Sequence, residues 1–141
     1  MQQFEAYQQA AVHTSDNVRI VSLLYDGALN FLKTARTRMG ERDIAGKCLS
    51  LGKATSIVTE LSGALNTDEG GEIARNLRRL YDFVLDRLLV ANLKNDATAL
   101  GDAEKVLATL RDAWKEMERN QVAAQAAHPR LPAGAGMAVR V

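Results

Sequence analysis

The most constraining feature of the sequence is the absence of proline from its first 128 residues. The only prolines, Pro129 and Pro132, stand near the end of the 141-residue chain. Proline breaks helix interiors because it lacks a backbone N–H and clashes with the preceding turn, so a long proline-free stretch favours helices. Apolar residues make up 47% of the chain and aromatic residues only 5%. The sequence therefore predicts one all-helical globular domain.

Apolar side chains recur at alternating spacings of three and four in four segments, which places them on one face of each helix. The predicted helices cover approximately residues 17–39, 43–65, 71–93 and 96–117. Asp16 is expected to cap the first helix. Because the connections between the segments are short, we expect antiparallel neighbours and an up-down-up-down four-helix bundle.

Two segments lie outside these helices. Residues 2–14 carry Phe4, Tyr7 and Val12 and are expected to form a short N-terminal capping helix. Residues 119–141 are rich in Ala and Gly, and we expect them to form a flexible, disordered tail. The expected division is a helical domain of residues 1–118 followed by this tail.

The predicted helices carry more apolar surface than a small core requires. A surface helix usually has an apolar stripe a little over 100° wide, and the first and third helices exceed it. The additional residues are Ile20, Leu23, Leu29, Leu32, Phe83, Leu85, Leu89, Val90 and Leu93. One interpretation is a centrally buried helix or a dimer interface. The other is a groove for a partner helix or an extended apolar peptide.

The chain offers few groups for catalysis or metal binding. His13 and His128 lie far apart, and neither has a ligand partner at helical spacing. Cys48 falls on the apolar stripe of the second helix, so we expect it to be buried. The stretch LNTDEGGEIARNL lacks the residues of a phosphate loop and predicts a corner between two helices. We therefore expect no enzyme, no metal and no cofactor.

The charge and targeting signals exclude several other classes. The net charge of +1 gives no field that would recruit nucleic acid or an anionic membrane. The N-terminus does not resemble a signal peptide, and no window is apolar enough for membrane insertion. A single cysteine fits a reducing compartment. We expect a cytoplasmic protein.

Three stretches occur in the order and spacing of a known family. They read LLYDGALNFLKTA, NTDEGGEIARNLRRLYDFVLDRLLVANLKND and LATLRDAWKEM. Together they resemble the FliS family, the flagellin export chaperones of the bacterial flagellum, over about residues 4–117. The resemblance implies a four-helix bundle that binds the disordered C-terminal segment of flagellin. Such a chaperone prevents premature polymerisation and assists delivery to the type III export gate.

The resemblance also suggests where a client binds. Phe4 and Tyr7 match an apolar residue and a tyrosine of the family's N-terminal cap, which covers part of the client groove and matters for docking to the export gate. We expect the second and third helices to line the groove. The candidate residues for client binding and for the cap are Phe4, Tyr7, Val12, Ile57, Leu61, Leu77 and Tyr81. The alternatives are a helical bundle that binds another client, such as an anti-sigma factor, and a structural homodimer.

Overall fold

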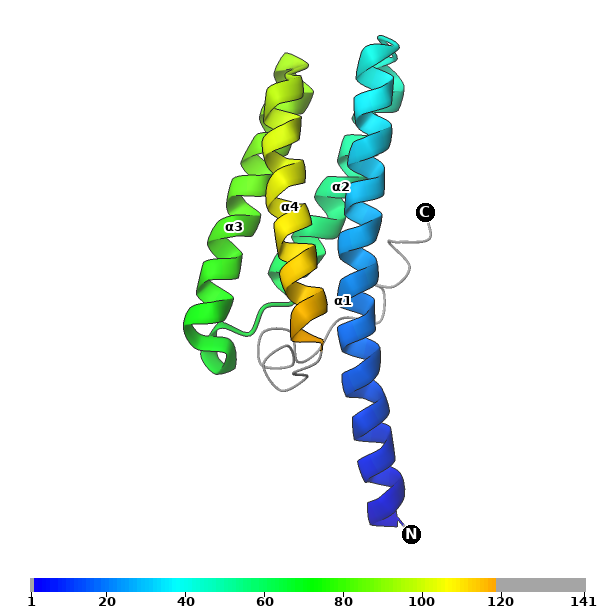
Figure 1. The fold of residues 1–141 in the computed structure, drawn as a ribbon, viewed down its shortest axis with the longest axis vertical. Helices are drawn as coiled ribbons and strands as arrows, with labels where there is room; N and C mark the ends of the chain where they lie inside the picture. The colour runs from blue at the N-terminus through cyan, green and yellow to red at the C-terminus, as the bar shows by residue number, and fades with distance from the viewer. Residues whose placement is uncertain (1, 119–141) are drawn as a thin grey trace.

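The computed structural model describes the backbone of residues 2–118 and the side chains of residues 18–118. The helices in chain order are α1 (Gln2–Gly40), α2 (Ile44–Gly63), α3 (Thr67–Lys94) and α4 (Ala97–Met117). Each helix packs against the next, and α4 packs back against α1, which gives an antiparallel four-helix bundle (Figure 1). The predicted all-α, up-down-up-down bundle is confirmed.

The first helix begins earlier than its apolar periodicity predicted. The backbone is helical from Gln2 onward, so Asp16 lies inside α1 and does not cap it. Residues 2–16 contain neither proline nor glycine, and nothing in their sequence stops a helix. The side chains of Phe4, Tyr7 and Val12 lie outside the described residues, as does the tail of residues 119–141.

The other three helices begin at polar residues whose side chains accept from free backbone N–H groups of the first turn. Asp43 accepts from the N–H of Gly46 at 2.9 Å. Asn66 Oδ1 accepts from the N–H groups of Asp68 and Glu69 at 3.2 and 3.0 Å. Asp96 plays the same part at the start of α4, where its Oδ1 accepts from Thr98 and Ala99. These caps fix the corners of the bundle and hence the antiparallel order.

The stretch LNTDEGGEIARNL forms the predicted corner between α2 and α3. After Asn66 the chain makes one helical turn and then breaks at Gly71, whose φ is 56° and ψ is −130°. An L side chain rarely adopts this conformation, because its Cβ would clash with the backbone. From Glu72 onward α3 runs without a break to Lys94.

We expect Gly71→Ala to destabilise the protein by about 1–3 kcal/mol because of backbone strain alone. A Cβ at this position meets no atom within 4 Å, so crowding adds nothing. The melting temperature should fall by roughly 3–10 °C in a thermal scan. The matched control is Gly52→Ala, inside α2, where an added Cβ also meets nothing within 4 Å. That control should gain about 0.5–1 kcal/mol, and equal effects of the two substitutions would contradict the strain argument.

Three aromatic side chains fill the centre of the bundle. Tyr25 of α1 and Tyr81 of α3 are 1% and 0% exposed, and their hydroxyl oxygens lie 2.5 Å apart across the diagonal of the bundle. Trp114 of α4 packs beside Tyr25 with ring centroids 6.5 Å apart. Its indole N–H donates to the backbone oxygen of Val18 at 3.2 Å. The hydrogen bonds offset the cost of burying these polar groups.

The tyrosine pair predicts a loss of stability in alkaline solution. Burial raises the pKa of Tyr25 from 10.0 to about 12, although its hydrogen bond to Tyr81 opposes this rise. The unfolded chain loses this proton near pH 10 while the folded chain keeps it. The stabilisation is therefore complete below pH 10 and is lost as the pH rises towards 12. The loss is on the order of 3 kcal/mol.

Urea unfolding at pH 8 to 11.5 checks this expectation. The free energy of unfolding of Tyr25→Phe should fall less steeply with pH than that of the unsubstituted chain. The other groups that titrate in this range are present in both proteins, so their effect cancels in the difference. Parallel curves for the two proteins would show that Tyr25 does not keep its proton in the fold.

Burial differs from the expectation where the start of α2 packs against the end of α3. Lys47 is only 3% exposed, and its Nζ donates to the Asn92 backbone oxygen at 3.0 Å and to Asn95 Oδ1 at 3.2 Å. A cation at the C-terminal end of a helix is favourable, because the last carbonyl groups carry partial negative charge. The prediction that Cys48 is buried is wrong, since this residue is exposed and its Sγ lies 3.2 Å from Asn92 Oδ1.

Candidate functional site

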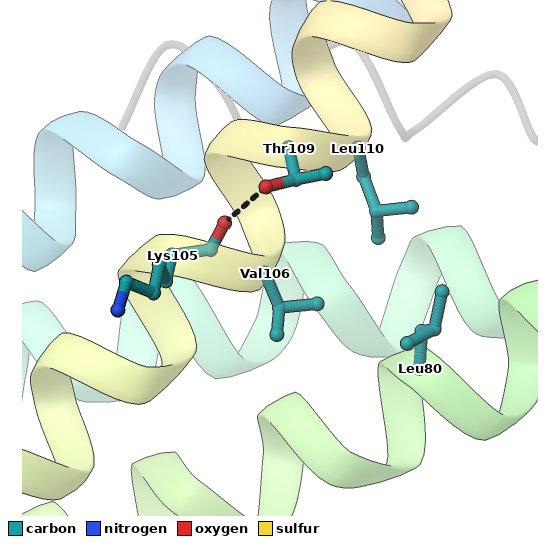
Figure 2. A pocket seen from close by; sticks show the side chains of 5 residues that line it. All are labelled: Leu80, Lys105, Val106, Thr109 and Leu110. Carbon is teal, nitrogen blue, oxygen red and sulfur yellow. Dashed lines mark hydrogen bonds between the residues drawn. The ribbon is translucent and has the colours of Figure 1, made fainter.

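A cavity of about 220 Å³ lies between α3 and α4. We call it the α3–α4 cavity; Leu80 of α3 and Lys105, Val106, Thr109 and Leu110 of α4 line it. Figure 2 shows Val106 and Leu110 pointing from α4 across the gap towards Leu80. Three aliphatic side chains from two helices therefore face a common space. Their spacing follows from the helical repeat, because residues four apart, such as Val106 and Leu110, lie on one face.

The polar groups of the two remaining lining residues are turned away from this space. Thr109 Oγ1 donates to the backbone oxygen of Lys105 at 2.9 Å, within α4 itself. The Lys105 ammonium lies apart from the leucines (Figure 2). The cavity consequently presents an apolar wall without a fixed charge, which suits an apolar side chain and not an ionic ligand.

Exposed apolar surface continues from the cavity along α3. Leu80 is 38% exposed, and Phe83, one turn further along the helix, is 44% exposed. The Arg87 guanidinium lies 5.9 Å from the centroid of the Phe83 ring and forms an ion pair with Asp86 at 2.7 Å. The apolar strip thus ends at a charged rim, an arrangement typical of protein interaction surfaces.

A second group of exposed apolar side chains lies where α2 begins and α3 ends. Ile44 and Leu49 of α2 are 55% and 62% exposed, and Leu89 and Leu93 of α3 are 56% and 76% exposed. We call these four residues the α2–α3 patch. The Cys48–Asn92 contact shows that the two helices adjoin here.

The described candidates for client binding all lie in the core. Ile57, Leu61 and Tyr81 are 0% exposed and Leu77 is 7% exposed. In this structure they face the other helices, and the surface beside them is formed by residues such as Leu80. Their contact with a client stays a prediction. On a helix whose apolar face is wider than the part that is buried, apolar residues point both into the core and towards solvent. The type and spacing of the residues therefore could not show which of them point inward.

Leu80 is the lining residue that the sequence patterns misplaced. The spacing of Ile73, Leu77 and Leu80 places them on one apolar stripe of the third helix, a pattern that favours burial, but Ile73 is 49% and Leu80 38% exposed. The excess of apolar residues on α3 indicated that some of them are exposed for a partner. It did not show which side chains these are.

The described residues offer no obvious centre for chemistry. Among residues 18–118, no three His, Cys, Asp or Glu side chains lie close enough to hold a metal ion. The helices in the described part of the chain contain no span long and apolar enough to cross a membrane. What this surface can do is bury apolar side chains of another polypeptide.

Comparison with known proteins identifies the family. A family model described as "Flagellar protein FliS" matches residues 1–121. The chain belongs to the FliS family. It is 38% identical over 110 residues to the flagellar secretion chaperone FliS of Salmonella typhimurium, covering 77% of this chain and 82% of the relative. It is 34% identical over 113 residues to the FliS of Bacillus subtilis, covering 80% and 84%.

A third FliS relative, FliSB of Pseudomonas aeruginosa, is 36% identical over 118 residues, which cover 81% of this chain and 94% of the relative. These relatives are flagellar secretion chaperones. The resemblance inferred from the sequence is confirmed, and with it the assignment to a family of chaperones and not of enzymes. The match includes all four helices of the bundle.

Proposed function

We propose that this FliS-family chain binds the C-terminal segment of flagellin in the cytoplasm, prevents its premature polymerisation and assists its delivery to the flagellar export gate. The observation that carries the proposal is the family match over residues 1–121, which spans the whole bundle. The exposed apolar side chains of α3 and α4 supply the binding chemistry. Residues 1–118 form the chaperone domain, and residues 119–141 form a separate tail.

The proposed mechanism is reversible burial of apolar side chains. An amphipathic client segment places one or more of them in the α3–α4 cavity, against Leu80, Val106 and Leu110. Burying one aliphatic side chain contributes about 1.5–3 kcal/mol, part of which offsets the entropy lost when a disordered segment becomes helical. While these side chains are covered, they are not available for contacts between flagellin subunits. The four buried candidates, Ile57, Leu61, Leu77 and Tyr81, belong to the core of the bundle, and their contact with the client stays a prediction.

The N-terminal segment has a role in the same proposal. Phe4, Tyr7 and Val12 cover part of the client surface in the free chaperone and take part in docking to the export gate. The support for this role is the family resemblance at Phe4 and Tyr7. Residues 2–16 continue the helix α1 in this structure, and we expect them to bend towards the bundle when they cover that surface.

Binding to full-length flagellin and to flagellin without its C-terminal segment tests the proposal. The full-length protein should co-purify with the chaperone as a 1:1 complex, whereas the truncated protein should not bind. Equal binding to both forms would overturn the proposal. The mass of the chaperone in solution without client separates a monomer from a homodimer, and a parallel mixture with an anti-sigma factor tests the alternative client.

A further inference from the structure

The chain contains a second polypeptide segment that fits the α3–α4 cavity, namely its own tail. We propose that residues 119–141 dock in the α3–α4 cavity of their own chain and compete there with the client. The inference rests on the proposed function in one respect, which is that the client uses the same cavity. Docking of the tail itself is independent of that function.

The position of the tail favours this occupant. The tail follows Glu118 directly, and Leu110 stands eight residues earlier on α4. Eight helical residues correspond to about 12 Å along the axis, a distance that about four extended residues can cover. The 23 residues of the tail could span up to roughly 75 Å when extended. After reversing direction, the tail can therefore reach the whole length of the cavity without strain.

The charge distribution of the chain also favours contact between tail and bundle. The tail carries three of the 18 basic side chains, Arg119, Arg130 and Arg140, and none of the 17 acidic ones. Residues 1–118 consequently have a net charge of −2 and the tail +3, with histidine neutral. Opposite charges raise the rate and the probability of encounter between two parts of one chain.

Exposed carboxylates lie where the tail begins. Asp68, Glu69 and Glu72 at the start of α3 and Glu116 near the end of α4 are exposed. The antiparallel arrangement brings the start of α3 and the end of α4 to the same end of the bundle (Figure 1). These carboxylates, beside which Arg75, Arg78 and Arg79 are also exposed, offer ion-pair partners for Arg119 where the tail begins.

The tail carries apolar side chains, and the wall of the α3–α4 cavity is also apolar. The larger apolar side chains of the tail stand among alanines and glycines; they are Val122, Leu131, Met137, Val139 and Val141. Leu131 lies between Pro129 and Pro132. The two prolines limit the conformations of the unbound chain and so lower the entropy lost on docking. A cavity of about 220 Å³ lined by aliphatic groups would receive such a side chain.

The expected strength of competition follows from effective concentration. A flexible link of this length gives a local concentration on the order of 1 mM. If the tail binds with a Kd of about 0.1 mM, it occupies the cavity about 90% of the time. The apparent affinity for the client is then reduced about tenfold.

Paramagnetic labelling of the full chain tests docking directly. A nitroxide is attached at Ala133→Cys, two residues after Leu131, in a chain that also carries Cys48→Ser, so that the label has one site and Leu131 is kept. Docking predicts selective broadening of the methyl resonances of Leu80, Val106 and Leu110, independent of protein concentration. Broadening that is absent from the cavity, or that falls on the α2–α3 patch, would overturn the proposal. Broadening that grows with concentration would assign the contact to a second copy and overturn docking within one chain.

Client affinity tests the competition with full-length variants. Leu131→Ser combined with Met137→Ser should bind the C-terminal peptide of flagellin about tenfold more tightly than the unsubstituted chain in calorimetry. The matched control, Gln121→Ser with Gln125→Ser, alters polar tail residues and should leave the affinity unchanged. Equal affinities of all three proteins would overturn the competition while leaving the proposed function intact. If none binds the peptide, the proposed function fails, and the labelling experiment still decides whether the tail docks.

Discussion

A chain carrying Leu80→Asp is expected to bind the C-terminal segment of flagellin roughly 100-fold more weakly than the unsubstituted chain, a loss of ~2.7 kcal/mol. Leu80 is the α3 side chain that faces Val106 and Leu110 across the α3–α4 cavity. Its replacement removes an apolar contact of about 1.5–3 kcal/mol and leaves a carboxylate that the client would desolvate. Isothermal titration calorimetry with the client peptide measures the effect.

Stability should change little in the same variant. Leu80 is 38% exposed, and an aspartate at this position can remain hydrated in the free chaperone. The matched control is Leu23→Asp on α1, where the leucine is 47% exposed and belongs to neither the α3–α4 cavity nor the α2–α3 patch. This control should bind the client peptide with nearly the affinity of the unsubstituted chain. If it binds as weakly as Leu80→Asp, the loss is a general effect of the added negative charge.

A third variant, Leu93→Asp, distinguishes the two apolar surfaces. Leu93 is 76% exposed in the α2–α3 patch. If the client depends on the α3–α4 cavity, Leu93→Asp weakens binding less than Leu80→Asp. The reverse order, with Leu80→Asp close to native, would show that the client anchors on the α2–α3 patch and that the α3–α4 cavity has been misassigned.

The largest loss of stability is expected from Trp114→Ala, at about 3–5 kcal/mol. Trp114 is 1% exposed, packs beside Tyr25 and donates its indole N–H to the Val18 backbone oxygen. Alanine would leave a large cavity between α1 and α4 and remove the hydrogen bond from the indole to the Val18 backbone oxygen. A loss of this size is a substantial fraction of the ~5–15 kcal/mol that stabilises a typical domain.

Urea denaturation followed by far-ultraviolet circular dichroism measures this loss, since the only tryptophan is absent from the variant. Trp114→Phe keeps most of the ring volume and should cost less than Trp114→Ala. Lys115→Ala, at the neighbouring exposed position, removes only an ion pair with Asp26 at 3.9 Å. Exposed pairs contribute about 0–1 kcal/mol. If Trp114→Ala costs no more than Lys115→Ala, the description of a packed aromatic centre is wrong.

The helices could be predicted because their signals are local. The spacing of apolar residues indicated each helix, and the fourth was predicted to start near Asp96, which caps it. The third was predicted from about residue 71, whereas its first turn begins at Thr67 and is capped by Asn66. The Gly-Gly pair predicted a corner, and Gly71 does interrupt α3 there. The start of α1 was less predictable, because apolar periodicity fades before Asp16 although no residue in the preceding segment opposes a helix.

The sequence predicted that the protein has an apolar binding surface, but not which residues form it. The excess of apolar residues on α3 indicated a binding surface, and Phe83, Leu89 and Leu93 are indeed exposed. The residues singled out for the groove are buried, and Tyr81 shows why. Tyr81 was expected to line the groove, but its hydroxyl meets the hydroxyl of Tyr25, 56 residues earlier in the chain, inside the bundle at 2.5 Å. No local pattern reports such a pairing.

The sequence by itself determined the helices, their order and the FliS family, since propensity, capping and motif spacing depend on neighbours along the chain. Tertiary structure decided which part of each apolar arc faces inward, because that rotation depends on how the other helices pack. Lys47 and Cys48 are the clearest case. Sequence pattern favoured a buried cysteine, yet the fold buries the lysine, because the end of α3 supplies oxygen acceptors for its ammonium group. The orientation of α3 likewise leaves Leu80 38% exposed, on the wall of the α3–α4 cavity.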